Sequence, residues 1–245
     1  MTLHLLDDLG VLTPRAQLFL AGHARRGPQS HHEVQREWYE CTDVDGSEVT
    51  GPDDGFLRLQ AFVAQYGGMS FCQERPGCTG KHTQTYRFDS VVQSGWQRTE
   101  SGGWVAEVGE IEGWPLVLDW STARIGIHIY HPETWIAHSL MNLVESAALG
   151  QSLYLGEGWK RAAKPGRGPG WEVATESLER LRNEVPEVAE ASSPWNHWLM
   201  DQDVAVHGWR ATYEPARRMA LVAWYRTPDG RRRLEAAVGP LGPDR

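Results

Sequence analysis

The sequence lacks any long hydrophobic run, and no window approaches the 18 apolar residues that a membrane-spanning helix requires. Its first residues lack the basic segment and the apolar stretch of a secretory signal peptide. Cysteine is scarce, because the chain contains only Cys41, Cys72 and Cys78, which cannot all pair with one another. These absences predict a cytoplasmic protein with reduced thiols and no membrane partner.

Basic residues are scarce in the first two thirds of the chain. Residues 1–163 carry 12 Lys and Arg against 20 Asp and Glu, whereas residues 164–245 carry 12 of each kind. Binding to a nucleic-acid backbone needs clustered Lys and Arg, so this balance argues against a nucleic-acid partner. An acidic surface instead suits a partner with a basic surface, because complementary charge speeds encounter.

Hydrophobic residues make up 40% of the chain, which is enough to build a core and is not the composition of a disordered protein. The sequence also contains 12 Trp residues. Trp is a costly choice unless it is buried or anchors a contact, so we expect most of these side chains to lie in the core.

The first helix is predicted at residues 13–26. Thr13 can cap this helix, Pro14 suits its first position, and Gly27 can end it. Four apolar residues share one face of this segment: Ala16, Phe19, Leu20 and Ala24.

A second helix is predicted at residues 55–66. Apolar residues recur there at three- and four-residue spacing, as Phe56, Leu59, Val63 and Tyr66. Asp53 and Asp54 place negative charge where a helix begins, and Gly67 can adopt the left-handed conformation that ends one.

Five short β-rich segments come after this helix, at residues 69–71, 83–88, 104–108, 116–119 and 125–130. In the last of them, Ile125, Ile127 and Ile129 alternate with less apolar residues, which predicts a strand with one buried face. Residues 119–124 have the length of a hairpin connection between the last two segments.

A third helix is predicted from Pro132 to Gly150, with an apolar face made of Ile136, Leu140, Leu143, Val144 and Ala147. The order of helix, several strands and helix predicts an α+β fold. We expect an antiparallel sheet of about five to six strands flanked by helices.

The composition changes after residue 155. Residues 156–170 are rich in Gly and Pro and predict a linker. Beyond it, the pattern predicts a helix at 172–185 with a Glu176–Arg180 ion pair, and strands at 203–213, 219–226 and 233–238. The expected organisation is a domain at 1–155, a linker at 156–170 and a small α+β extension at 171–245 that could pack on the first domain.

Several segments between residues 53 and 150 carry a family resemblance. They are the helix that ends at Gly67-Gly68, the segments 86–89 and 108–110, the segment 115–119 leading into 125–128, and the closing helix around 136–145. In this order they resemble the SUKH superfamily of SMI1/KNR4-like proteins, and the spacing is most similar to the SUKH-3 type. The resemblance covers roughly residues 1–155, and the extension after the linker has no counterpart in it.

The resemblance implies a bacterial immunity protein, which neutralises a cognate protein toxin by occluding its active site. It implies a non-catalytic role and a cytoplasmic location. Fungal members of the family are regulatory scaffolds, so a scaffold without a toxin partner is an alternative function.

The best candidate for a metal site is formed by Cys72, Cys78 and His82, because thiolate and imidazole groups suit zinc. Cys41, His31 or His32 could supply the fourth ligand of a tetrahedral set. The spacing is looser than that of an ordinary zinc knuckle, and the same segment also fits an irregular loop with free thiols. No cofactor is therefore expected, and a zinc-binding protein or metal-dependent enzyme stands as a second alternative.

No catalytic residues are predicted. His128, His131 and His138 gather near the third predicted helix, but they do not form the His-Glu-x-x-His pattern of zinc hydrolases. Ser139 comes directly after His138, and neighbours along a helix point to different faces. No Gly-x-Ser-x-Gly motif is present, so we expect the protein not to be an enzyme.

Acidic and aromatic residues are the candidates for partner binding, since interface hot spots favour Trp, Tyr and Arg. One acidic group precedes the second helix and another lies around the central strands. The predicted binding residues are Asp43, Asp45, Asp53, Asp54, Glu110, Glu112, Trp114 and Trp120. An ordinary solvated face is the alternative interpretation of the acidic residues.

Overall fold

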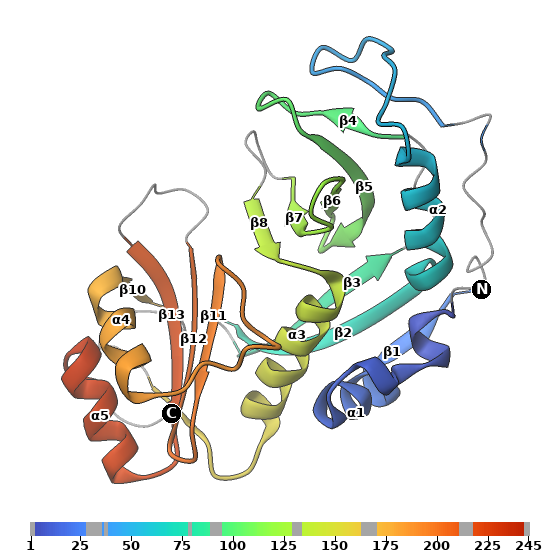
Figure 1. Ribbon diagram of the computed structural model, residues 1–245. Coiled ribbons are helices and arrows are strands. Elements are labelled where there is room, and N and C mark those ends of the chain that lie inside the picture. The colour runs from blue at the N-terminus through green and yellow to red at the C-terminus, as the bar shows by residue number, and fades with distance from the viewer. Residues whose placement is uncertain are drawn as a thin grey trace. The chain divides into compact units, whose positions relative to one another are not determined.

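The computed structural model describes residues 3–27, 36, 39–77, 80–88, 95–128, 134–162, 171–210 and 218–242. Its contacts divide the chain into two units. Unit 1 comprises Met1–Gln73 and Thr83–Met141, and unit 2 comprises Glu74–His82 and Asn142–Arg245. Each unit contains an antiparallel sheet and helices (Figure 1), which confirms the predicted α+β class.

The sheet of unit 1 is larger than predicted. Its strands follow the order β1-β2-β3-β5-β6-β7-β8, and β4 pairs with β5 beside this path. The bounds are β1 Ala24–Arg26, β2 Met69–Gly77, β3 Gly80–Phe88, β4 Gln97–Arg98, β5 Trp104–Ile111, β6 Trp114–Asp119, β7 Ile125–Ile127 and β8 Thr134–Ala137. The predicted hairpin connection at residues 119–124 joins β6 to β7, which are antiparallel neighbours.

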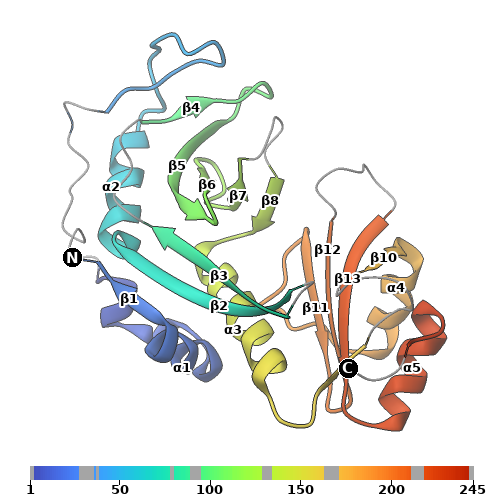
Figure 2. The ribbon, with the colours of Figure 1, turned by 180° about the vertical axis from the view of Figure 1, so that it is seen from behind.

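The first helix, α1 (Pro14–His23), begins as predicted and ends three residues early. The Thr13 hydroxyl accepts a hydrogen bond from the Ala16 amide, as an N-cap should. Residues 24–26 leave the helix and form β1, in which Ala24 lies opposite Phe71 of β2. The prediction of helix as far as residue 26 was wrong, because pairing at the open edge of β2 outweighs local helix propensity. Figure 2 shows α1 and β1 from behind.

Aromatic side chains fill the core of unit 1. Phe19 of α1 packs edge-on against Phe71 of β2, with ring centroids 5.7 Å apart. Phe71 stacks on Tyr86 of β3 at 4.6 Å. The ring centroid of Phe62 in α2 (Gly55–Tyr66) lies 6.4 Å from that of Phe88. Both helices are therefore fixed on the sheet by apolar and aromatic contact.

The end of α2 differs in detail from the prediction. Gly67 has φ −59, and the left-handed residue is Gly68 with φ +73. The expectation that Gly67 adopts the left-handed conformation was therefore wrong by one position. Gly67 is needed for another reason, because a Cβ there would lie 2.5 Å from the carbonyl oxygen of Val63.

The third predicted helix was wrong in its first part. Residues Thr134–Ala137 form β8, which pairs with β7, and α3 runs from Leu140 to Leu155. Pro132, the expected start, lies outside the described residues. The helix continues through Gly150, which is buried. One interior Gly costs a helix about 1 kcal/mol, and burial of the apolar residues of α3 outweighs that cost.

The sheet of unit 2 has helices on both faces. Its strands follow the order β10-β13-β12-β11, and β9 pairs with one end of β13. Leu178 of α4 and Leu234 of α5 share one apolar cluster with the sheet, and Leu149 and Leu153 of α3 share the other. The bounds are β9 Lys160–Arg161, β10 Trp171–Ala174, α4 Thr175–Glu184, β11 Asn196–Met200, β12 Val204–Arg210, β13 Arg218–Tyr225 and α5 Pro228–Val238.

The chain after residue 155 corrects several expectations. The predicted helix at 172–185 was wrong at its start, because residues Trp171–Ala174 form a strand and α4 begins at Thr175. Strand β11 was not predicted. Residues 233–238 belong to α5 and not to a strand, because Thr227 caps a helix there by accepting from the Gly230 amide. Arg180 donates to the backbone carbonyl of Glu176 in place of the expected ion pair with its side chain.

The contacts of α3 differ from the expected organisation of the chain. Residues Asn142–Leu155, which the predicted domain at 1–155 includes, are assigned by their contacts to unit 2. The predicted linker contains β9, and residues 163–170 of it lie outside the described part. None of the described helices is long and apolar enough to cross a membrane.

Candidate functional site

The predicted partner-binding residues lie at opposite ends of the β5–β6 hairpin. Glu110, Glu112 and Trp114 surround its turn, where Ile111 lies opposite Trp114. The other residues are at the far end, where β5 begins at Trp104. At about 3.3 Å per strand residue, the two ends are roughly 20 Å apart. The structure thus divides the predicted set into two separate groups.

Trp120 is at the centre of the group at the far end of the hairpin, where β5 begins. Its indole Nε1 donates a hydrogen bond to Asp54 Oδ1 at 2.8 Å, although the two residues are 66 positions apart. Arg58 Nε donates to Asp54 Oδ2 at 2.8 Å, and its guanidinium carbon lies 5.0 Å from the centroid of the Trp120 ring. Arg58 also donates to the backbone carbonyl of Trp120. We call Asp54, Arg58 and Trp120 the Trp120 cluster.

The turn between β6 and β7 presents Trp120. Asp119 Oδ1 accepts hydrogen bonds from the amide and the hydroxyl of both Ser121 and Thr122, and Arg124 donates to Oδ2 at 2.9 Å. Burial acts to raise the pKa of Asp119, but these hydrogen bonds outweigh burial and lower it. The carboxylate therefore stays charged at neutral pH and holds the turn in one conformation.

Asp54 joins α2 to this turn. It is the N-cap residue of α2, yet its side chain makes no capping hydrogen bond and reaches Trp120 instead. The hydrogen bond from Arg58, followed by that from Trp120, lowers the pKa of Asp54. A charged carboxylate is the better acceptor for both donors.

Two more arginines lie over tryptophan rings in unit 1. Arg98 of β4 lies 5.8 Å from the ring centroid of Trp104, and its Nη1 is 3.8 Å from Asp43 Oδ2. Arg124 lies 3.8 Å from the ring centroid of Trp135 in β8. The Trp104 pair adjoins the Trp120 cluster, because the Trp120 amide donates to the carbonyl of Trp104 at 3.0 Å.

Acidic residues lie on the segments next to the Arg98–Trp104 pair and the Trp120 cluster. Residues 41–49 form a turn held by hydrogen bonds from Thr42 to Trp96 and from Asp43 to Ser47, which places this acidic loop beside β4. The exposed acidic residues are Glu40 just before the loop, Asp45 and Glu48 within it, Asp53 at the start of α2 and Glu100 in the β4–β5 turn. These five acidic residues therefore belong to segments that adjoin the Arg98–Trp104 pair and the Trp120 cluster.

Buried aromatic side chains pack against the first turn of α2. Trp96 is 1% exposed, and a Cβ added to Gly55 would lie 2.6 Å from its Nε1 and 2.4 Å from the hydroxyl of Tyr39. Burial, followed by the Cys41 thiol, raises the pKa of Tyr39. Only Gly fits at position 55, so the first turn of α2 and the adjacent Asp54 are held against these rings.

The group around the β5–β6 turn does not form a cluster of this kind. Glu110 pairs with Arg87 at 2.7 Å on the sheet, and both side chains are well exposed. Glu112 has φ +53 and precedes Gly113 with φ +82, so it belongs to the tight turn of the hairpin. Trp114 is 44% exposed. These residues make ordinary strand and turn contacts and do not converge on a common point.

The predicted zinc ligands are only partly covered by the structure. Cys72 lies on β2, where its Sγ is 3.5 Å from Thr85 Oγ1, and Cys41 is buried next to Gly51. Cys78, His31 and His32 lie outside the described residues. Among the residues that the structure describes, no group of three His, Cys, Asp or Glu is arranged to hold a metal ion.

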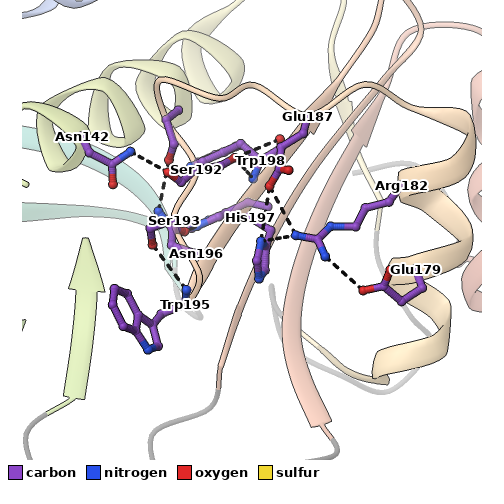
Figure 3. A network of polar contacts seen from close by, with 12 residues as sticks. Asn142, Glu179, Arg182, Glu187, Ser192, Ser193, Trp195, Asn196, His197 and Trp198 are labelled. Atoms are coloured by element: carbon purple, nitrogen blue, oxygen red, sulfur yellow. Dashed lines mark hydrogen bonds and ion pairs between the residues drawn. The ribbon is translucent and has the colours of Figure 1, made fainter. Parts of the chain in front are cut away.

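A polar network in unit 2 was not predicted from the sequence. Arg182, Glu187 and His197 meet where α4 approaches β11 (Figure 3), and Asn142 donates to the carbonyls of Glu190 and Ser192 nearby. No local motif signals these contacts, because their partners come from separate elements.

Comparison of the chain with models of known protein families, with curated proteins and with solved structures finds no match.

Proposed function

We propose that the protein is a non-catalytic, cytoplasmic immunity protein, which binds a protein toxin with a basic surface and occludes its active site. The observation that carries the proposal is the Trp120 cluster, which lies next to the acidic loop and the acidic start of α2 in unit 1. The nature of the partner comes from the resemblance to SUKH proteins, and the place of contact comes from the cluster.

The residue types of the cluster favour binding to another protein. Trp and Arg are the side chains that most often dominate the energy of protein interfaces. Trp120 is half-buried and held by hydrogen bonds at both its indole and its backbone. Because its conformation is fixed before binding, little side-chain entropy is lost on association.

The charges around the cluster favour a basic partner. Glu40, Asp45, Glu48, Asp53 and Glu100 are exposed there, whereas Arg58 and Arg98 are engaged with Asp54 and Asp43. A field of one sign raises the rate of encounter with an oppositely charged surface and rejects partners of like charge. A toxin that acts on nucleic acid would present such a basic surface.

Co-expression tests the proposal. The protein would be produced together with the toxin-domain protein encoded directly beside its gene, and cell growth would be recorded. We expect growth with the wild-type chain and with Trp114→Ala, and growth arrest with Trp120→Ala produced at the same level. If the wild-type protein fails to restore growth and does not co-purify with the toxin, the proposal is wrong.

A further inference from the structure

The edge of the unit 2 sheet is covered by the segment that comes after α4. The Met200 amide donates to the carbonyl of Pro186 at 2.9 Å, and the Val188 amide donates to that of Trp198 at 2.8 Å. These bonds lie on either side of the bridge between Glu187 and Leu199. We call residues 186–188 the strap, which occupies hydrogen-bonding groups that an open edge strand would expose.

One arginine joins α4, the strap and β11. Arg182 Nη2 donates to His197 Nδ1 at 2.6 Å and to Glu187 Oε1 at 3.3 Å. Its Nη1 donates to Glu179 Oε1 at 3.0 Å. Glu187 Oε1 also lies 3.4 Å from His197 Nδ1, so this carboxylate lies close to both Arg182 and His197 (Figure 3).

The chemistry of these groups determines the protonation of His197. A guanidinium has five N–H donors and no acceptor, so His197 Nδ1 must carry a lone pair while it binds Arg182. The imidazole is then neutral, with its proton on Nε2. A proton added at Nδ1 would place two N–H groups against each other, and Arg182 could no longer bind there.

The surroundings of His197 oppose protonation. Burial, followed by the positive charge of Arg182, lowers its pKa, and the carboxylates of Glu187 and Glu179 partly offset both effects. Glu179 and Arg182 belong to α4, Glu187 belongs to the strap, and the residue opposite His197 on β12 is the uncharged Gly208. The His197 side chain is 12% exposed, so a proton can still reach it.

We propose that His197 is an acid-sensitive link that exchanges Arg182 for Glu187 when it takes up a proton. The cationic ring then donates from Nδ1 to Glu187, which joins β11 to the strap more firmly. Arg182 keeps Glu179, which lies on its own helix, and loses its contact with β11. Acid therefore releases the last turn of α4 from the sheet edge and leaves the strap in place.

Breaking the hydrogen bond between Arg182 and His197 raises the free energy of the folded state. Arg182 Nε is buried and has no hydrogen-bond partner in the described part of the chain, so the guanidinium has already lost one contact with water. The pKa of His197 in the folded protein lies below its ordinary value of 6.5. The hydrogen bond between Arg182 and His197 therefore contributes fully to the free energy of unfolding above pH 6.5. Its contribution decreases as the pH falls from 6.5 through the folded pKa.

Hydrogen exchange followed by NMR at pH 7.5 and 5.5, corrected for intrinsic rates, tests the link in the full chain. We expect protection of the amides of residues 182–184 to fall at least threefold at the lower pH, while Val188 keeps its protection. His197→Gln retains an acceptor for Arg182 and cannot gain a proton, so this variant should lose the pH response. His138→Gln, a matched change at an exposed histidine of unit 1, should retain it.

Two results would overturn the proposal. One is an equal pH response in the wild-type protein and in His197→Gln. The other comes from the ¹⁵N shifts of the His197 ring in the wild-type protein, which do not depend on any variant folding. We expect the Nε2–H tautomer at pH 7.5, and a proton on Nδ1 at that pH would contradict the assignment of Nδ1 as the acceptor.

Discussion

At the scale of single residues, Asp54 has an unusual position. It begins α2, where a carboxylate would ordinarily cap the first turn, and it instead accepts from Trp120 and Arg58. The residues next to it decide whether this arrangement forms. Gly55 lies against the hydroxyl of Tyr39 and the indole of Trp96, so the start of α2 is set by the absence of a side chain.

Gly55→Ala tests that close approach. The added methyl group would lie 2.4 Å from the Tyr39 hydroxyl and 2.6 Å from Trp96 Nε1, so the rings or the helix must move. Overpacking of this kind costs about 1–3 kcal/mol, which urea denaturation would detect as a lower free energy of unfolding. The Trp120 indole proton should also shift in the NMR spectrum, because Asp54 moves with the helix.

Gly22→Ala is the matched control for that variant. Gly22 lies in α1, and an added Cβ there meets nothing within 4 Å. Replacing a helical Gly with Ala stabilises a helix by about 0.5–1 kcal/mol. Destabilisation by both variants, or by neither, would contradict the packing argument at Gly55.

At the scale of elements, the sequence predicts some helices and strands better than others. Of the predicted stripe, Leu59, Val63 and Tyr66 are buried and Phe56 is half-buried, and α2 has the predicted bounds. The segment around Ile136 fits a helical pattern equally well, yet it forms β8, because β7 offers it a pairing edge. Tertiary contacts of this kind have no local signal in the sequence.

The last helix illustrates a different limit. Pro228, Asp229 and Gly230 favour a turn, and they also suit the first turn of a helix after the cap Thr227. The residues after Gly230 decide between the two, and Leu234, Ala237 and Val238 are buried at helical spacing. Giving weight to this spacing would have predicted α5 from the sequence.

Ser146→Ala tests how α3 is attached to the unit 2 sheet. The Ser146 hydroxyl accepts from Asn196 Nδ2 at 2.9 Å and from Trp198 Nε1 at 2.8 Å, and all three residues are buried. Removing the acceptor leaves two buried donors without it, which lowers the free energy of unfolding by about 2 kcal/mol. Chemical denaturation would measure the change.

Ser152→Ala is the corresponding control on the same helix. The Ser152 side chain is exposed and donates to the Leu149 carbonyl within α3. We expect a change within about 0.5 kcal/mol, as for most surface substitutions. If both variants lowered the free energy of unfolding equally, the hydrogen bonds between Ser146 and β11 would not explain the loss of stability.

At the scale of the whole molecule, the candidate binding residues and the acid-sensitive link belong to different units. The acidic loop, the Arg–Trp pairs and the Trp120 cluster all belong to unit 1. Unit 2 contains a second sheet with helices on both faces, and the polar network around Arg182 joins α4 to β11. Partner binding and the acid-sensitive link can therefore be tested separately.

The candidate site was predictable in composition and not in arrangement. Asp53, Asp54 and Trp120 could be chosen as candidate binding residues from their type and from the acidity around them. Nothing local in the sequence brings Trp120 to Asp54, because 66 positions and several strands separate them. The same pattern grouped Glu110 and Trp114 with this site, although the β5–β6 hairpin places them at its other end.

The affinity of the purified protein for the purified toxin-domain protein encoded beside its gene tests the central claim most directly. Loss of an interface hot spot costs about 2 kcal/mol or more, so Trp120→Ala should raise Kd by roughly 30-fold. Trp114→Ala, which removes an exposed Trp at the opposite end of the hairpin, should change Kd by less than about threefold. An unchanged Kd in Trp120→Ala together with a large loss in Trp114→Ala would contradict the assignment of the Trp120 cluster as the binding site.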